Sequence, residues 1–238
     1  TFGLANRLSA PFARKICYTF PESGAHLPEG KGVFTGLPIR EQLLHGSREK
    51  GLRLCGFSEN KPVLVVTGGS QGAAFINRMV RRTLPKLLET FQVCHLCGKG
   101  NVDGKLEGTP GYRQFAYVTD DLPDVFAMAD MVVTRGGSTS LFELLALQKP
   151  MLIIPYSRKA SRGDQIINGR SFQKQGFGEV LMETDENGMD LMPAAFLRAV
   201  RQVYESRERC VENMRESPAR GGAQNVFAVL CEVAGLPL

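Results

Sequence analysis

Apolar, β-branched runs alternate with segments of helical period over most of the chain, from Lys61 onward. Strands are expected where apolar residues stand together in short runs, and helices where they recur every three or four positions. The predicted strands cover residues 62–67, 93–96, 112–118, 131–134, 151–155 and 179–182. The predicted helices cover residues 71–88, 122–129, 140–147 and 165–175, and a mostly helical tail begins at Pro193. This alternation predicts an α/β fold with a doubly wound, Rossmann-like parallel sheet.

The first sixty residues follow a different pattern. A helix end and a strand are expected between Phe12 and Phe20, and a short strand at 32–35, after which Pro, Gly and charged residues dominate through Asn60. Two or three isolated elements cannot bury a sheet on both faces. We therefore interpret residues 1–40 as the remnant of an N-terminal domain, 41–60 as a linker and 61–238 as one large domain.

The composition is that of an ordinary globular protein. The 238 residues are 43% hydrophobic and 22% charged, which argues against disorder and fibrous repeats. No apolar run reaches the roughly 18 residues of a membrane span, and Thr1–Leu8 does not have the pattern of a secretory signal. The formal charge of +5 comes from scattered basic residues without interleaved aromatic residues, so no nucleic-acid partner is expected.

Six cysteines do not indicate a disulfide framework or a metal site. Cys94 and Cys97 form a lone C-x-x-C on a predicted strand, where positions three apart point to opposite faces. A zinc site would need a second pair of ligands at a suitable spacing, and the sequence has none. Reduced, structural cysteines are expected, with no metal.

The loops after the strands are the places to look for chemistry, because ligands of such sheets bind at the carboxyl ends of the strands. The first loop, Thr67-Gly-Gly-Ser-Gln-Gly-Ala73, brings Gly68, Gly69 and Gly72 before a helix. Glycines allow close approach to a ligand, and Ser70 can either donate to a phosphate or simply cap the helix. The glycine spacing is not the dinucleotide signature and no ribose-binding acid follows, which disfavours a dinucleotide-dependent oxidoreductase.

A second glycine turn, Thr134-Arg-Gly-Gly-Ser-Thr-Ser-Leu-Phe-Glu143, again joins a buried strand to a helix. Gly136 and Gly137 precede hydroxyl groups that suit a diphosphate at a helix start. Glu143 can accept two hydrogen bonds from a ribose diol, or it can be the capping-box partner of Ser140. Both interpretations of Glu143 stand on the sequence alone.

A third polar loop follows the strand that ends at Pro155 and leads into a helix beginning near Asp164. Asp164, Gln165 and Asn168 fall on one side of its first turn. Carboxylate and amide groups there suit sugar hydroxyls, although an N-cap Asp with solvent-facing amides explains them equally well. Three such loops on one sheet edge together predict a ligand with phosphate and polyhydroxyl parts.

These motifs resemble a known family in their order along the chain, over about residues 3–233. The family is that of the bacterial UDP-N-acetylglucosamine–N-acetylmuramyl-(pentapeptide) pyrophosphoryl-undecaprenol N-acetylglucosaminyltransferases, which make lipid II from lipid I and belong to glycosyltransferase family 28. The motifs that carry the resemblance are the first glycine turn, Tyr117-Val-Thr-Asp-Asp121, Arg135-Gly-Gly-Ser138 with Glu143, Pro155, and Asp164-Gln165 with Asn168.

The resemblance implies a GT-B fold, of which this chain would supply the donor-binding domain and the end of the acceptor domain. It implies no cofactor. It also implies roles for single residues. Arg40 and Ser70 would contact the diphosphate or the sugar-phosphate, and Thr139 and Ser140 a phosphate. Glu143 would contact the ribose and the backbone of Thr119 the uracil. The N-acetylglucosamine would be contacted by Asp164, Gln165 and Asn168.

The implied reaction is an inverting transfer of N-acetylglucosamine from UDP-N-acetylglucosamine to lipid I at the cytoplasmic face of the cell membrane, where the enzyme is a peripheral protein. The catalytic residues are unknown, since the base would belong to the acceptor half, most of which is missing here. This chain alone is therefore expected to bind the donor weakly and to transfer nothing. The alternative is a non-catalytic UDP-sugar-binding subunit completed by a separate acceptor partner, for which the Gly3–Arg40 segment would have no use.

Overall fold

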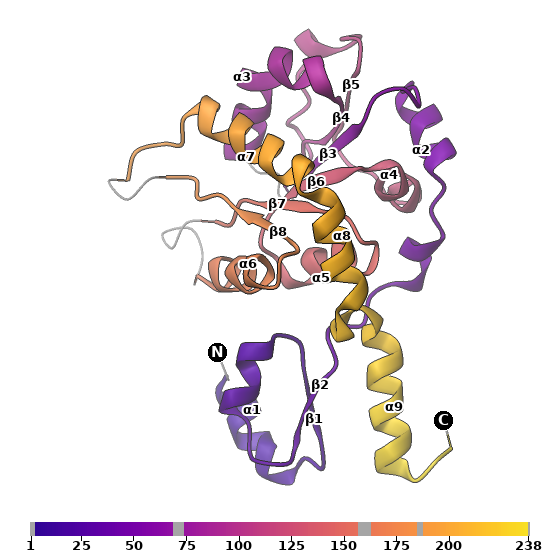
Figure 1. Cartoon of the computed structure of the whole chain (residues 1–238), viewed down its shortest axis with the longest axis vertical. Coiled ribbons are helices and arrows are strands. Elements are labelled where there is room, and N and C mark those ends of the chain that lie inside the picture. The colour runs from indigo at the N-terminus through magenta and orange to yellow at the C-terminus, as the bar shows by residue number, and fades with distance from the viewer. Residues whose placement is uncertain (1–2, 69–73, 157–162, 185–187, 238) are drawn as a thin grey trace.

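A six-stranded parallel sheet organises the chain from Val63 onward (Figure 1). The computed structural model describes residues 3–68, 74–156, 163–184 and 188–237. The strand order is β5-β4-β3-β6-β7-β8, and every neighbouring pair is parallel. The strands are β3 (Val63–Thr67), β4 (Gln92–Leu96), β5 (Tyr112–Phe115), β6 (Met131–Thr134), β7 (Met151–Ile153) and β8 (Gly178–Val180).

This order places the switch point of the sheet between β3 and β6. The chain moves outward in one direction through β4 and β5, returns to β6, and then moves outward in the other direction. Loops that leave adjacent strands in opposite directions open a crevice between them. The two predicted glycine turns follow these same two strands, so the fold brings them to one point of the sheet edge.

Alternating strand residues bury into two separate cores. Val63 and Val65 of β3 face one core, and Leu64 and Val66 face the other, as the period of two in a strand requires. Helices α3 (Ala74–Thr90) and α7 (Pro193–Glu205) cover the Leu64 face. The Val63 face is covered by α2 (Arg48–Cys55), α4 (Leu122–Met128), α5 (Ser138–Ala146) and α6 (Asp164–Lys174). With helices on both faces, the predicted doubly wound sheet is confirmed.

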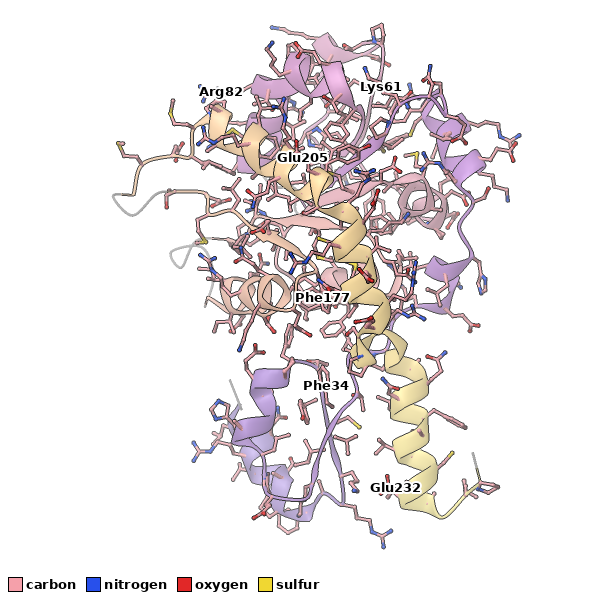
Figure 2. The ribbon with its side chains drawn as sticks, in the orientation of Figure 1. Phe34, Lys61, Arg82, Phe177, Glu205 and Glu232 are labelled. Atoms are coloured by element: carbon pink, nitrogen blue, oxygen red, sulfur yellow. The ribbon has the colours of Figure 1, made fainter. Side chains whose placement is uncertain are left out.

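A small lower part holds a two-stranded parallel sheet of β1 (Ile16–Tyr18) and β2 (Gly32–Phe34) (Figure 1). The chain enters through α1 (Leu4–Ser9) and the 3₁₀ turn η1 (Ala10–Phe12), and η2 (Pro21–His26) joins the two strands. From β2 the chain runs up into the large part. Phe34, the last residue of β2, is labelled in Figure 2 and packs against the core on the Val63 face.

The C-terminal helix α9 (Gly222–Ala234) leaves the large part and lies beside the small one (Figure 1). It follows α8 (Arg207–Glu216) and η5 (Pro218–Gly221). Glu232 lies near the far end of α9 (Figure 2). Its Oε1 is 3.3 Å from Lys15 Nζ, and Arg14 Nη1 donates to the Val233 carbonyl at 3.1 Å. The chain after the sheet thus contacts the N-terminal segment. The predicted division into residues 1–40, 41–60 and 61–238 did not include such a contact.

Residues 41–60 are folded against the large part. They hold η3 (Glu41–His45) and α2, and Leu43 and Leu52 are buried in the core on the Val63 face. Ser47 caps α2 by accepting from the Lys50 N–H, and its own N–H donates to Asp124 Oδ1 at 2.7 Å. The segment predicted as a linker therefore includes a helix packed on α4, while the division into domains stays a prediction.

Among the described helices, none combines the length and the hydropathy that crossing a bilayer demands. All six cysteines are free thiols; Cys17 is exposed and the other five are buried.

Candidate functional site

A cleft of about 650 Å³ lies at the carboxyl edge of the sheet, where the sequence predicted a ligand. It is lined by residues from the ends of β3 and β4, from the loop after β5, from the first two turns of α4 and α5, and from η3 with Arg40 before it. Four predicted site residues are among its lining residues, namely Arg40, Thr119, Ser140 and Glu143. The cleft therefore gathers segments that are far apart in the sequence.

One part of the cleft lining comes from the chain between β5 and α4. The predicted strand continued to Val118, but β5 ends at Phe115, and residues 116–120 turn along the cleft instead. The Thr119 carbonyl accepts from the Leu122 N–H at 3.2 Å, which turns the chain into α4. Apolar side chains back this segment, contributed by Leu43, Leu96, Val118, Leu122 and Phe126. A flat apolar ring with polar edges suits a site of this kind.

Another part of the lining comes from α5 and Arg40. Helix α5 begins at Ser138 with Gly137 as its N-cap, two residues earlier than predicted. Because Ser140 is therefore inside the helix, the capping-box interpretation of Glu143 is wrong. Glu143 instead accepts a 3.0 Å hydrogen bond from Nη2 of Arg40. The Glu143 side chain is 8% exposed and the Arg40 side chain 63%, so a nearly buried carboxylate meets a largely solvated guanidinium.

The first glycine turn lies mostly outside the described residues. Gly68 is buried directly after β3, and Thr67 before it lines the cleft. Gly69, Ser70 and Gly72 lie outside the described ranges, so their predicted contacts with a phosphate stay predictions.

The predicted sugar-binding residues lie beside the second glycine turn and not among the residues that line the cleft. Gln165 Oε1 accepts from the Tyr156 N–H at 3.2 Å, and Asn168 Nδ2 donates to the Gly136 carbonyl at 3.1 Å. A Cβ on Gly136 would collide with the Gln165 carbonyl oxygen, so a glycine is needed there for α6 to approach. Asp164 is exposed at the first position of α6.

Thr139 and Gly137 complete the second turn. Thr139 is exposed in the first turn of α5 and does not line the cleft, whereas Ser140 does. Gly137 has open space around it, since an added Cβ would meet no atom within 4 Å. The unobstructed start of α5 is compatible with an anion at its N-terminus.

Two residues near the cleft were missed as site candidates. Tyr117 lines the cleft with an exposed side chain, although it was noticed only as part of a motif. Arg135 stood inside the second glycine motif, where its partner Glu183, 48 residues later, gave no local signal. Predicting Tyr117 and Arg135 as site residues would have required knowing which loops meet at the sheet edge.

The described residues offer no group of three or more His, Cys, Asp or Glu arranged to hold a metal ion. His95 is buried outside the cleft and bonded to Asn77 and Tyr112. His26 and His45 are exposed and do not line the cleft either. The charged side chains that line the cleft in this part of the chain are those of Arg40, Asp120 and Glu143, and α5 begins beside them.

Comparison with known proteins agrees with this architecture. The model of the glycosyltransferase family 28 C-terminal domain matches residues 63–227. A protein of Geobacillus thermodenitrificans is 49% identical over 234 residues, which are 98% of this chain and 64% of the relative. A protein of Clostridium tetani is 44% identical over 230 residues, which are 97% and 63%. Both are named UDP-N-acetylglucosamine--N-acetylmuramyl-(pentapeptide) pyrophosphoryl-undecaprenol N-acetylglucosamine transferase.

Solved structures share the fold at low sequence identity. The crystal structure of Acinetobacter baumannii MurG superposes with a TM-score of 0.66 at 16% identity, over 97% of this chain and 63% of MurG. The glycotransferase of kitacinnamycin also gives 0.66, at 19% identity, over 94% and 55%. This chain spans about 64% of the length of the curated relatives it matches. The match over residues 63–227 and the identity of these relatives show that the chain belongs to glycosyltransferase family 28, as the sequence motifs predicted.

Proposed function

We propose that this chain binds UDP-N-acetylglucosamine and supplies the donor side of an inverting N-acetylglucosaminyltransferase. The acceptor would be the lipid-linked N-acetylmuramyl-(pentapeptide) pyrophosphoryl-undecaprenol, so that the product is lipid II of peptidoglycan synthesis. The observation that carries the proposal is the cleft at the switch point, which combines Arg40, Ser140 and Glu143 with an apolar end. The names of the relatives supply the donor and the acceptor.

The apolar and the polar parts of the cleft lining suit the two parts of a uridine diphosphate. The loop of residues 116–119 and its apolar backing would hold the uracil, with backbone groups at Thr119 reading its edge. Helix α5 lines the cleft through Ser140 and Glu143, and the backbone N–H groups and dipole at its N-terminus would favour phosphate oxygens. Thr139 and Ser140 would add hydroxyl donors there, and the turn of Gly68, Gly69, Ser70 and Gly72 would approach the phosphates from β3.

Nucleotide binding would exchange the partners of the Arg40–Glu143 ion pair. Each group satisfies the other in the structure, at 3.0 Å. A ribose diol would donate two hydrogen bonds to the Glu143 carboxylate, and the diphosphate would attract the Arg40 guanidinium. Because Arg40 is largely solvated and lies on an exposed connection, its side chain can move at little cost.

In the transfer, the acceptor hydroxyl would attack the anomeric carbon while the bond to the β-phosphate breaks. The charge that develops on the leaving diphosphate would be stabilised by the α5 N-terminus and by Arg40. Asp164, Gln165 and Asn168 would orient the sugar from α6. The general base would come from the part of the relatives' length that lies outside the matched region.

The lipid acceptor implies work at a membrane surface. We place the complete enzyme at the cytoplasmic face of the bacterial membrane as a peripheral protein. The reason is that an undecaprenol chain keeps the acceptor in the bilayer while the nucleotide donor is water-soluble.

Calorimetric titration tests the proposal. The chain is expected to bind UDP-N-acetylglucosamine and UDP, with no binding of NAD at the same concentrations. Glu143→Ala should weaken both uridine nucleotides, whereas Asp120→Ala, which removes an exposed carboxylate from the same cleft, should weaken neither. Binding of NAD alone, or full affinity in Glu143→Ala, would contradict the proposed donor site.

A further inference from the structure

A buried cluster around Arg135 joins the ends of three strands beside the second glycine turn. Nη1 of Arg135 donates to the Ile154 carbonyl after β7 at 3.0 Å and to Glu183 Oε1 after β8 at 2.6 Å. The Arg135 side chain is 7% exposed and that of Glu183 15%. Arg135 itself directly follows β6. The cluster therefore ties together the carboxyl ends of β6, β7 and β8.

The same guanidinium stacks on an aromatic ring. The Arg135 Cζ lies 4.0 Å from the centroid of the Tyr156 ring, a close cation–π contact. The N–H of Tyr156 donates to Gln165 Oε1 at 3.2 Å. Arg135 thus fixes the residue that in turn fixes the Gln165 side chain at the start of α6.

The turn next to Arg135 makes a second connection to α6. The Gly136 carbonyl accepts from Asn168 Nδ2 at 3.1 Å, and an added Cβ on Gly136 would lie 3.0 Å from the Gln165 Cβ. The Gln165 and Asn168 side chains are therefore both held through residues that Arg135 contacts or adjoins. The opposite side of the same turn begins α5, whose first residue is Ser138.

An ion pair with so little exposure is costly unless geometry and further contacts compensate for desolvation. Here Arg135 has a carboxylate, a main-chain carbonyl and a ring. Its Nε has no hydrogen-bond partner among the described residues. A buried lysine could supply the charge and bond both acceptors from one nitrogen, as Nη1 does here, but it has no planar guanidinium to stack on the Tyr156 ring.

We propose that Arg135 is a positioning residue for the donor sugar. It holds the start of α6, with Gln165 and Asn168, at a fixed place relative to the start of α5. The groups that bind the sugar and those that bind the phosphates therefore keep a constant relative position. This assignment rests on the proposed function. It concerns only the sugar part of the ligand, because the uracil end of the cleft is built from other segments.

The test compares two ligands in one protein. Affinities of the whole 238-residue chain for UDP-N-acetylglucosamine and for UDP are measured by calorimetry, with thermal melting, in the wild type, Arg135→Lys and Glu183→Gln. Arg135→Lys is expected to weaken UDP-N-acetylglucosamine about tenfold more than UDP, since small displacements of orienting groups are costly. Glu183→Gln should shift the same ratio in the same direction but less.

Arg48→Lys is the matched control. Arg48 also donates to a main-chain carbonyl, that of Met128 at 2.6 Å, and pairs with Glu59 and Asp130 at the opposite edge of the sheet. The Arg48→Lys substitution should leave the ratio of the affinities for UDP-N-acetylglucosamine and UDP unchanged, even if the melting temperature falls. An equal loss of both affinities in Arg135→Lys and Glu183→Gln, or no loss, would overturn the positioning role alone. A wild-type chain that binds neither ligand would overturn the proposed function and this role with it.

Discussion

The two edges of the sheet hold buried or half-buried charges in different ways. At the amino edge, Asp130 Oδ2 accepts from the Val63 N–H at 2.7 Å, and Lys149 Nζ donates to the carbonyls of Ala127 and Ala129 at 3.1 and 2.8 Å. These charges are anchored by main-chain groups of the fold itself. In the cleft at the carboxyl edge, Glu143 is held by the side chain of Arg40, which is 63% exposed, whereas the buried Arg135–Glu183 pair at the same edge has a main-chain partner as the amino-edge charges do.

The difference separates structural charges from exchangeable ones. Main-chain partners cannot leave without local unfolding, so the amino-edge charges contribute to stability. A solvated side chain can leave freely, so the carboxyl-edge carboxylate can take a ligand in its place. Substitutions at the two edges should therefore affect different measurements, which the following predictions use from the largest expected effect to the smallest.

Glu143→Ala should have the largest effect, on binding. Loss of a charged acceptor for a ribose diol is expected to cost about 1.5 to 3 kcal/mol of binding free energy, or about 10- to 100-fold in the Kd for UDP. The free energy of unfolding should change by less than about 1 kcal/mol, because the lost partner is a solvated arginine. Titration calorimetry and urea unfolding measure the two quantities, and a variant that is destabilised but binds normally would place Glu143 with the structural charges.

Asp130→Ala should show the opposite behaviour. It leaves the Val63 N–H without its acceptor and removes a partner of Arg48, so the free energy of unfolding should fall by about 2 to 3 kcal/mol. UDP affinity should stay within about twofold of the wild type, because the cleft is at the other edge. A large loss of affinity in a folded Asp130→Ala protein would remove the distinction between the edges.

His95 is a titratable side chain that is fully buried, unlike the charges at either edge of the sheet. Its Nε2 lies 2.9 Å from Asn77 Oδ1, an acceptor, so this nitrogen carries the proton and Nδ1 accepts from the Tyr112 hydroxyl at 2.9 Å. Burial, aided by Arg81, lowers the pKa of His95 from 6.5 to about 3. In the unfolded chain His95 is therefore protonated as the pH falls below about 6.5, whereas in the folded chain it stays neutral until about pH 3.

The stability that depends on neutral His95 is fully present above pH 6.5 and is lost as the pH falls from 6.5 toward 3. The expected loss is roughly 1.4 kcal/mol per pH unit in that window, or roughly 2 kcal/mol at pH 5. Urea unfolding at pH 7 and pH 5 should show this decrease in the wild type and in the exposed control His26→Gln, but a smaller one in His95→Gln. Equal pH dependence in all three proteins would contradict the assignment.

Arg40→Ala should have the smallest effect. Since the Arg40 guanidinium is largely solvated, UDP affinity is expected to fall about fivefold, or about 1 kcal/mol, and the fall should shrink in high salt. A double-mutant cycle with Glu143→Ala sharpens this prediction. Unfolding free energies should show a small coupling between the two residues without ligand and none at saturating UDP. A rise in affinity in Arg40→Ala would mean that Arg40 only obstructs Glu143.

The sequence predicted the sheet well because its signals are local. Runs such as Val63–Thr67 and Met131–Thr134 consist of apolar residues that are buried on both faces of the sheet. A glycine turn follows each run, so the sequence marks where each of these strands ends. Residues 116–118 were wrongly added to a strand, because their apolar character serves the cleft and not the sheet. Helix α2 was missed in a charged segment, although Ser47 and Gly56 mark its ends.

The candidate site could be predicted only in part. Glycine turns are visible in sequence because the backbone itself must turn there, and the topology then brought Arg40, Ser140 and Glu143 to one cleft. The pairing of Arg40 with Glu143 spans 103 residues, and that of Arg135 with Glu183 spans 48. No local pattern encodes such partners, since they follow from the strand order.

Amide hydrogen exchange with and without saturating UDP-N-acetylglucosamine tests the central claim most directly. The ligand should slow exchange in residues 116–119 and in the first turn of α5, Ser138–Ser140, because both segments would contact it through their backbone. The amino edge around Asp130 and Lys149 should exchange at the same rate in both states. Protection confined to that edge or to the small N-terminal part, with residues 116–119 and 138–140 unchanged, would contradict the account.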